Sequence, residues 1–280
     1  MKIVKFTKNK ESLWRKIIGQ KKRLNKIKFE VHVADHCNLN CQMCDHFSPL
    51  AEPCFLREDD FEKDIRRMAE LFDGEAEYVR LLGGEPLLHP NIEAFFEIAR
   101  KYFKKTDIYL YTNGLLLPKM SKRFWEEIRE NSIKMWITKY PIKFDYELIE
   151  EKLREEKIDF YYENPNWVKF SWKLPLNLSK KQNNKRNYMI CTIGNTWPLL
   201  KNGVLYPCPI PPNVEHFNKY FKKEIEVSPR DGIDIYQAKD ANEIFDFLCR
   251  PIPFCGNCNV KERTRNYKWK TSQRSIDEWS

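Results

Sequence analysis

The sequence predicts an α/β fold class, with a parallel sheet followed by a small cysteine-rich C-terminal domain. Short β-rich runs alternate with amphipathic helical stretches from residue 29 to residue 162, which is typical of βα units. Glycine-containing and cysteine-containing motifs follow these runs directly, where parallel sheets place their ligand sites. Beyond Arg186 the sequence becomes rich in proline, short strands and cysteine, so we place a domain boundary there.

Five strands and four helices account for the alternating region. Each predicted strand is rich in β-branched and aromatic residues, and each predicted helix has apolar residues at helical spacing. The predicted strands are 29–34, 78–82, 107–111, 133–138 and 158–162. The predicted helices are 59–72, 91–103, 119–131 and 145–155.

The excess of positive charge is concentrated at the N-terminus. The 280 residues include 49 Lys or Arg and 40 Asp or Glu, for a formal charge of +9. Residues 1–28 hold 11 of the basic residues against the single acid Glu11, which defines a basic N-terminal arm. The arm shows no regular aromatic interleaving, so we expect no nucleic-acid partner.

The N-terminal sequence also bears on the location of the protein. No N-terminal segment combines a basic head with a continuous apolar stretch, so we expect neither a secretory signal nor a transmembrane segment. We therefore expect a cytoplasmic protein, in which disulfides are rare. Metal binding is then the more natural role for clusters among the nine cysteines.

Cys37, Cys41 and Cys44 follow the first predicted strand in a CxxxCxxC spacing. Cysteine thiolates hold iron–sulfur clusters, normally four to a 4Fe–4S unit, so three neighbouring ligands predict a cluster with one open iron site. A zinc site is the alternative. Zinc ligands usually come as two CxxC or Cys/His pairs, which the three-residue gap between Cys37 and Cys41 fits poorly.

The segment from Cys37 to Cys44 resembles the signature of the radical S-adenosylmethionine (SAM) superfamily. The resemblance implies that SAM binds the open iron and that its reductive cleavage gives a 5′-deoxyadenosyl radical, which abstracts hydrogen from the substrate. It also implies a partial (β/α)6 barrel, which we place at residues 29–186 with a sixth strand near 168–172. An external one-electron reductant such as flavodoxin or ferredoxin is the implied protein partner.

Two further motifs resemble SAM-binding motifs of this family. Gly83, Gly84 and Glu85 begin a GGEP sequence after the second strand, where glycines let a ligand approach the backbone and the carboxylate suits the ammonium group of SAM. Asn113, which follows the third strand, lies by this resemblance near the ribose and methionine parts of SAM, although Asn-Gly alone is ordinary turn chemistry. Met43 takes the position that packs near adenine in the family.

The candidate catalytic residues are selected by position. His46, with Asp45 beside it, follows the cysteine loop and is a candidate for acid–base work or for structural support. Lys139 and Tyr140 follow the fourth strand and are candidates for the substrate face. Cys249 would return a hydrogen atom to a substrate radical if it lay near the barrel mouth, although a lone cysteine is more often an ordinary buried residue.

A second cysteine set resembles Twitch, a shortened SPASM domain that holds an auxiliary 4Fe–4S cluster. By this resemblance the domain covers residues 187–260, with a hairpin around Asn202 and Gly203 and a helix at 242–248, and residues 261–280 form a C-terminal tail. A fully ligated auxiliary cluster points to electron transfer or structural support, and a zinc site with the same ligands is the alternative. The four ligands are Cys191, Cys208, Cys255 and Cys258.

The whole layout resembles the 2-deoxy-scyllo-inosamine dehydrogenases of aminoglycoside synthesis and radical SAM proteins associated with surface polysaccharides. The resemblance implies dehydrogenation or epimerisation at a hydroxyl-bearing carbon of a sugar, sugar-nucleotide or cyclitol substrate. A peptide-modifying maturase is one alternative, but only about 28 residues precede the first strand, which leaves little room for a peptide-recognition domain. A non-catalytic metal-binding scaffold is the other alternative.

Overall fold

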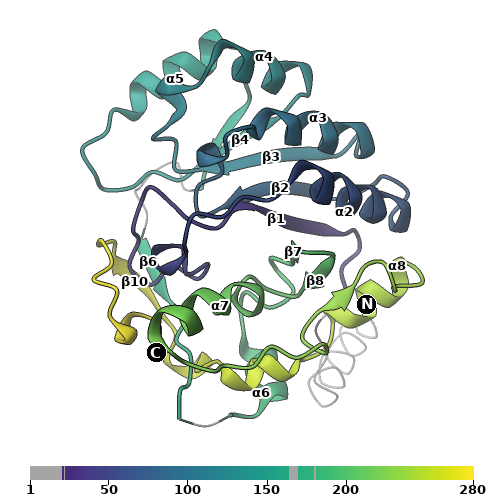
Figure 1. The fold of residues 1–280 in the computed structure, drawn as a ribbon, viewed down its shortest axis with the longest axis vertical. Coiled ribbons are helices and arrows are strands. Elements are labelled where there is room, and N and C mark those ends of the chain that lie inside the picture. Colours follow the sequence, from purple (N-terminus) through teal and green to yellow (C-terminus); the bar gives the residue numbers. More distant parts are fainter. Residues whose placement is uncertain (1–20, 22, 164–169, 180) are drawn as a thin grey trace, which may run out of the picture.

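An eight-stranded sheet in the order β5-β4-β3-β2-β1-β7-β8-β9 organises the fold (Figure 1). The computed structural model describes residues 21, 23–163, 170–179 and 181–280, so most of the predicted basic arm lies outside the described residues. Strands β1 to β5 are parallel, β7 joins β1 in parallel, and β8 and β9 are antiparallel additions. The strands are β1 (Lys28–Ala34), β2 (Tyr78–Gly83), β3 (Asp107–Thr112), β4 (Lys134–Ile137), β5 (Phe160–Tyr162), β7 (Leu199–Lys201), β8 (Val204–Tyr206) and β9 (Ile233–Asp234).

Four helices connect the parallel strands and cover one face of the sheet (Figure 1). They are α2 (Glu58–Leu71), α3 (Ile92–Tyr102), α4 (Lys122–Glu130) and α5 (Tyr146–Glu155), each close to its predicted range. Ser121 and Asp145 cap α4 and α5 by accepting hydrogen bonds from backbone N–H groups of the first turn. The C-terminal part adds α6 (Asn184–Ile190), α7 (Ile210–Phe221) and α8 (Ala241–Leu248). Among the described residues, no helix has the length and apolar composition needed to cross a bilayer.

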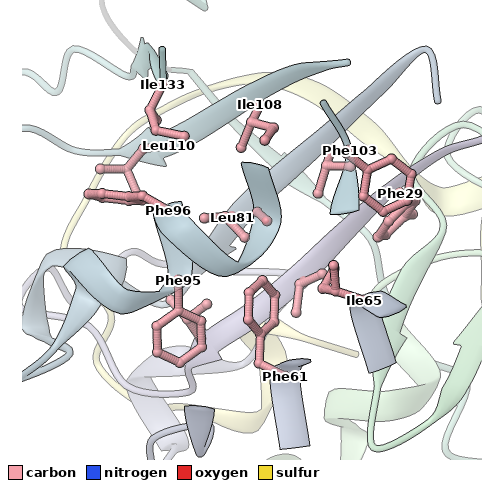
Figure 2. Packing of buried hydrophobic residues seen from close by; sticks show 14 of the residues in the cluster. Phe29, Phe61, Ile65, Leu81, Phe95, Phe96, Phe103, Ile108, Leu110 and Ile133 are labelled. Atoms are coloured by element: carbon pink, nitrogen blue, oxygen red, sulfur yellow. The ribbon is translucent and has the colours of Figure 1, made fainter. Parts of the chain in front are cut away.

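The two faces of the sheet carry different side chains. Phe29, Leu81, Ile108 and other alternate strand residues pack against α2 and α3 in the main hydrophobic core (Figure 2). The residues between them, such as Glu30 and Arg80, point to the opposite face because successive side chains of a strand alternate. A hydrophobic layer cannot cover this polar face of the sheet favourably, so the face is suited to a cavity or to polar partners.

The predicted hairpin forms at β7 and β8. Asn202 and Gly203 both have positive φ, 53° and 74°, which is the backbone that a tight two-residue hairpin requires. Because β7 also pairs with β1, the sheet continues across the boundary that the sequence predicts after residue 186. The C-terminal part nevertheless has a hydrophobic cluster of its own, centred on residues such as Phe217 and Phe254.

The predicted sixth strand of the barrel is wrong. Strand β6 (Phe170–Lys173) forms near the expected position, but it belongs to a separate two-stranded sheet and pairs antiparallel with β10 (Thr264–Lys268). Its partner comes from the C-terminal tail, which no local pattern of residues indicates. The parallel neighbour that extends the main sheet beyond β1 is instead β7.

The C-terminal tail packs on the cysteine loop that follows β1. Gln42 N donates to the carbonyl of Lys270 at 2.9 Å, and Ser272 N donates to the carbonyl of Asn40 at 2.7 Å. Trp279 is 2% exposed, and its indole Nε1 donates to the carbonyl of Cys44 at 2.8 Å. The Trp279 indole therefore docks the C-terminal tail on the cysteine loop.

Asp64 links the helix layer to the hairpin. Gly203 N donates to Asp64 Oδ2 at 2.9 Å, and the hydroxyl of Tyr236 donates to Oδ1. We predict that Asp64→Ala lowers the free energy of unfolding by about 1–3 kcal/mol, because it leaves a buried N–H without an acceptor. Urea denaturation measures this change. Asp60→Ala, on the same helix with a side chain 62% exposed, should change it by less than about 0.5 kcal/mol, and equal losses in the two variants would contradict the prediction.

Candidate active site

A cavity of about 390 Å³ lies on the sheet face opposite α2 and α3. Its wall brings together the three cysteines of the CxxxCxxC loop, both glycines of GGEP and most of the other predicted site residues. The predicted residues that line it are Cys37, Cys41, Met43, Cys44, His46, Gly83, Gly84, Asn113 and Tyr140. The strand order thus places sequence motifs far apart in the chain around one space.

The three cysteines of the loop are half-buried, and their thiols lie close enough to repel one another as thiolates. Burial, followed by the charges of Glu85, Cys41 and Cys44, raises the pKa of Cys37 well above its ordinary value. Burial also raises the pKa of Cys44 to about 12. Three neighbouring thiolates are stable only beside a positive centre. A bound metal ion supplies that charge, and it deprotonates the thiols that coordinate it. The donor set therefore fits an iron–sulfur cluster.

The glycines of GGEP allow the ends of β1 and β2 to touch. A Cβ on Gly83 would lie 2.1 Å from the carbonyl oxygen of Ala34, and a Cβ on Gly84 would lie 2.2 Å from that of His36. Gly84 N donates to Ala34 O at 2.7 Å, and Glu85 N donates to His36 O at 3.0 Å. The motif thus fixes the start of the cysteine loop, in addition to lining the cavity.

Glu85 lies beneath the cavity wall. It is 1% exposed, is not among the lining residues, and accepts hydrogen bonds from Thr112 Oγ1 at 2.6 Å, Asn113 N at 3.0 Å and Leu87 N at 3.1 Å. Burial raises its pKa to about 7 against these hydrogen bonds. In this structure the carboxylate ties the end of β2 to the end of β3. Contact with the ammonium group of SAM stays a prediction.

Asn113 connects the end of β3 to the cysteine loop. Its Nδ2 donates to Oδ1 of Asn38 at 2.7 Å. Met43, on the other side of the loop, has a φ of 62°, which is uncommon for a residue with a side chain, and lines the cavity. Asn113 and Met43 therefore lie where a molecule bound at the cysteine loop would contact them.

His46 is the predicted acid–base candidate that reaches the cavity. Its Nδ1 lies at hydrogen-bonding distance from Nε2 of His32, whose Nδ1 lies 3.0 Å from Oδ1 of Asp35. Burial lowers the pKa of His32 to about 3, so this ring is neutral and donates one hydrogen bond while accepting another. Lys201 Nζ lies 3.3 Å from both Asp35 oxygens, which keeps the carboxylate in place. This series of side chains orients the His46 ring.

Two predicted catalytic residues do not line the cavity, and these predictions are corrected here. Lys139 Nζ lies 3.0 Å from Glu150 Oε1 and 4.0 Å from the ring centroid of Tyr162, so α5 holds it. Cys249 is 5% exposed at the end of α8, on the side of the second cysteine set, where its carbonyl accepts a hydrogen bond from Lys21 N. Its location argues against hydrogen return to a substrate, because the thiol does not line the cavity.

The inner face of the sheet supplies functional candidates that our sequence prediction omitted. Glu30 and Arg80 lie side by side in the register of β1 and β2, and both line the cavity. The signal was present in the sequence, because charged residues interrupt strands that a parallel sheet buried on both faces would keep apolar. The aromatic residues that also line the cavity are Tyr78, Tyr111, Trp136, Tyr140, Trp197 and Trp269.

Glu30 and Arg80 form a buried ion pair. Arg80 Nη1 donates to Glu30 Oε1 at 2.7 Å. The side chain of Arg80 is 9% exposed and that of Glu30 is 4% exposed. Arg80 Cζ lies 5.0, 5.2 and 4.9 Å from the ring centroids of Tyr78, Tyr111 and Trp136. Burial raises the pKa of Glu30 to about 7, although the Arg80 charge opposes the shift. The aromatic rings thus hold the guanidinium group in one orientation.

The second cysteine set gathers in the C-terminal hydrophobic cluster. Burial, followed by the charges of the other three members, raises the pKa of Cys208 well above its ordinary value. Cys191 Sγ accepts hydrogen bonds from Arg263 Nη1 at 3.0 Å and from Gly194 N at 3.1 Å. Asn187 Nδ2 donates to the carbonyls of Cys255 and Cys258, which holds the CxxC turn. The structure therefore brings all four predicted ligands together.

The spread of the thiols bears on the metal that fits. A zinc ion with Zn–S bonds of about 2.3 Å holds its sulfurs about 3.8 Å apart. Within the described part of the chain, three ligand atoms lie within 4.8 Å of one another at Asp35, Glu215 and His216, and no three thiols do so. In the group formed by Asp35, Glu215 and His216, the ammonium of Lys201 already binds the carboxylates, with Nζ 2.9 Å from Glu215 Oε1. The wider thiol spacing suits a cluster in which each thiolate binds a different iron.

The model of the radical SAM superfamily matches residues 31–167, which include the cysteine loop, GGEP and Asn113. Residues 31–167 are thereby identified as a radical SAM domain. The family implies SAM and a 4Fe–4S cluster as cofactors, and no disulfide joins any of the nine cysteines, all of which the structure describes. The predicted family resemblance and the α/β fold class are thereby confirmed.

Curated relatives match only part of the chain. GTP 3′,8-cyclase of Aliarcobacter butzleri is 38% identical over 96 residues, which are 33% of this chain and 29% of that protein. GTP 3′,8-cyclase of Helicobacter pylori strain 26695 is 34% identical over 94 residues, with the same coverage. The chain thus spans under a third of the length of these relatives.

Solved structures resemble the chain over a greater length. BtrN, in complex with AdoMet and 2-DOIA, has a TM-score of 0.51 and 16% identity, covering 85% of this chain and 94% of that one. The anSMEcpe protein with bound AdoMet has a TM-score of 0.51 and 15% identity, covering 78% of this chain and 80% of that one. At these identities the likeness concerns the fold.

Gly84→Ala tests the contact between the strand ends. Because the new Cβ would lie 2.2 Å from His36 O, the cysteine loop must shift, and we predict a loss of about 1–3 kcal/mol in the free energy of unfolding together with reduced iron binding. Asp60→Ala, whose side chain is 62% exposed on α2, is the control and should reduce neither stability nor iron binding measurably. Urea denaturation and iron analysis after anaerobic reconstitution measure both effects. Full iron binding in Gly84→Ala would contradict the assignment.

Glu30→Gln tests the raised pKa of the buried carboxyl. A glutamate whose pKa is about 7 in the folded state and 4.5 in the unfolded state stabilises the fold below pH 4.5, and this contribution is lost as pH rises through 7. We therefore predict that Glu30→Gln gains stability relative to wild type between pH 5 and pH 7.5, by up to about 1.4 kcal/mol per pH unit. Urea denaturation of the metal-free protein across this range measures the difference. A difference that stays constant with pH would contradict the prediction.

Proposed function

We propose that this protein is a radical SAM dehydrogenase that oxidises a hydroxyl-bearing carbon of a carbohydrate or cyclitol. One observation carries the proposal: a single cavity joins the CxxxCxxC thiols to an inner wall of aromatic rings and a neutral ion pair. Aromatic rings stack on the apolar faces of sugar rings, while carboxylates and N–H groups bind hydroxyls. Radical generation and polyol binding are thus adjacent.

The charge of the cavity disfavours a nucleoside triphosphate such as GTP, although GTP cyclases are among the relatives. Among the described residues that line the cavity, Arg80 is the one Lys or Arg, and Glu30 already neutralises it. Asp45 and Glu163 add further negative charge to the wall. A triphosphate needs several basic groups or backbone N–H donors, so an uncharged ring suits this wall better.

The chain's own residues have assignable tasks in this reaction. When bound, the cluster and SAM supply a 5′-deoxyadenosyl radical that removes a hydrogen atom from the substrate. His46, oriented by His32, is the group that we assign to accept the hydroxyl proton of the substrate. Tyr140 and Trp269, whose rings lie edge to face at 5.7 Å, cover the cysteine end of the cavity and exclude water.

We assign the four cysteines of the second set to hold an auxiliary 4Fe–4S cluster, which would take the electron released in oxidation. No three of these thiols lie within 4.8 Å of one another, whereas one zinc ion would hold them about 3.8 Å apart, which supports this assignment. Because Cys249 does not line the cavity, no thiol from that part of the chain is available for hydrogen return, and dehydrogenation is favoured over epimerisation. An external one-electron reductant, an uncharged sugar or cyclitol substrate and a cytoplasmic location complete the proposal.

Anaerobic reconstitution followed by turnover tests the proposed function. We predict about eight irons per chain, falling to about four in Cys41→Ala and in Cys208→Ala, because each four-iron cluster needs its thiolates. Incubation with reductant, SAM and candidate polyols in deuterated water should give 5′-deoxyadenosine and a sugar product lighter by two mass units. Deuterium in the product would instead indicate epimerisation, and zinc without SAM cleavage would favour a non-catalytic scaffold.

A further inference from the structure

Two buried N–H groups on the inner wall of the cavity lack a hydrogen-bond partner among the described residues. They are Arg80 Nε on β2 and Trp136 Nε1 on β4, and both residues line the cavity; Trp269 of the C-terminal tail, which also lines it, has a third such group, Nε1. A buried donor without an acceptor costs about 1–3 kcal/mol, so native structures rarely leave two of them together. Because these donors belong to a cavity, a ligand oxygen can satisfy them.

The two donors are held rigidly and close to each other. The centroid of the Trp136 ring lies 4.9 Å from Arg80 Cζ, and Tyr78 and Tyr111 lie at similar distances from the same atom. Glu30 Oε1 accepts from Arg80 Nη1, and the Tyr78 hydroxyl accepts from Nη2 at 3.2 Å, so Nε is the guanidinium nitrogen that has no partner among the described residues. The arrangement is therefore a preformed pair of donors beside one carboxylate.

Charge limits what this pair can bind. Arg80 and Glu30 neutralise each other at 2.7 Å, so a phosphate placed here would meet a carboxylate without gaining an unpaired cation. A hydroxyl group suits the site from both sides, since its oxygen accepts from Nε or Nε1 and its proton goes to Glu30 Oε2. Uncharged polyols meet both requirements.

The donors lie deep below the cysteine loop. Arg80 precedes Gly83, at the end of β2, by three residues, which corresponds to about 10 Å along a strand. A ring bound at Arg80 and Trp136 is therefore separated from the glycines by about 10 Å, which is longer than one sugar ring. The deep end can identify the substrate while another part of it meets the radical.

We propose that Glu30, Arg80 and Trp136 form a subsite for an uncharged, hydroxyl-bearing ring, in which Arg80 Nε and Trp136 Nε1 donate to ring oxygens. The assignment rests on the proposed function and adds the residues that select the substrate. Arg80 and Trp136 are specificity-determining residues of this subsite. Neither is needed to generate the radical.

Trp136→Phe tests the subsite because it keeps an aromatic ring and removes the N–H donor. The reconstituted holoenzyme with SAM is titrated with methyl α-D-glucoside, myo-inositol, UDP-N-acetylglucosamine and GTP, and binding is measured by calorimetry. For each polyol that wild type binds, we expect Kd to rise about tenfold in Trp136→Phe, with the Kd of SAM unchanged. Trp125→Phe, on the far side of the sheet in α4, is the matched control and should leave both values unchanged.

The outcomes separate the subsite from the proposed function. An unchanged polyol Kd in Trp136→Phe, preferred binding of GTP, or no polyol binding to wild type overturns the subsite. Arg80→Lys keeps the charge and loses Nε, so loss of polyol binding with retained reductant-dependent 5′-deoxyadenosine supports it. Absence of 5′-deoxyadenosine from wild type, with polyol binding still sensitive to Trp136→Phe, overturns the proposed function and leaves the subsite intact.

Discussion

The close backbone contact between the ends of β1 and β2 is the constraint on which the rest of the site depends. Gly83 and Gly84 have no Cβ, so Ala34 and His36 approach them closely enough for two backbone hydrogen bonds. These bonds set the direction in which the chain leaves β1, and the three cysteines follow within eight residues of His36. Through Glu85, the same contact extends to the end of β3.

The sheet assigns separate tasks to its two faces. One face packs residues such as Phe29 and Leu81 against helices and supplies most of the buried apolar area. The other face buries less apolar area, because it carries the Glu30 and Arg80 ion pair together with several aromatic rings. Polar groups on a buried face are unfavourable unless they are paired or bind something, so this face is best understood as a binding surface.

The elements specified by local chemistry were predictable from the sequence. The five parallel strands and four helices lie within a few residues of their predicted ranges, and Asn202-Gly203 forms the expected turn because both residues tolerate positive φ. The pairing of β6 with β10 was not predictable, since it joins segments far apart in the chain. Lys139 and Cys249 were misplaced for a related reason: position after an element does not determine which way a side chain points.

The docking of the tail on the cysteine loop has a consequence for the order of assembly. Gln42 and Cys44 receive backbone and indole partners from Lys270 and Trp279, which the ribosome adds more than 220 residues later. Until then the loop is attached to the nascent chain only through β1 and its neighbours. The cysteine loop is therefore among the last parts of this sheet edge to gain all of its partners, and its thiols are less covered while synthesis is still in progress.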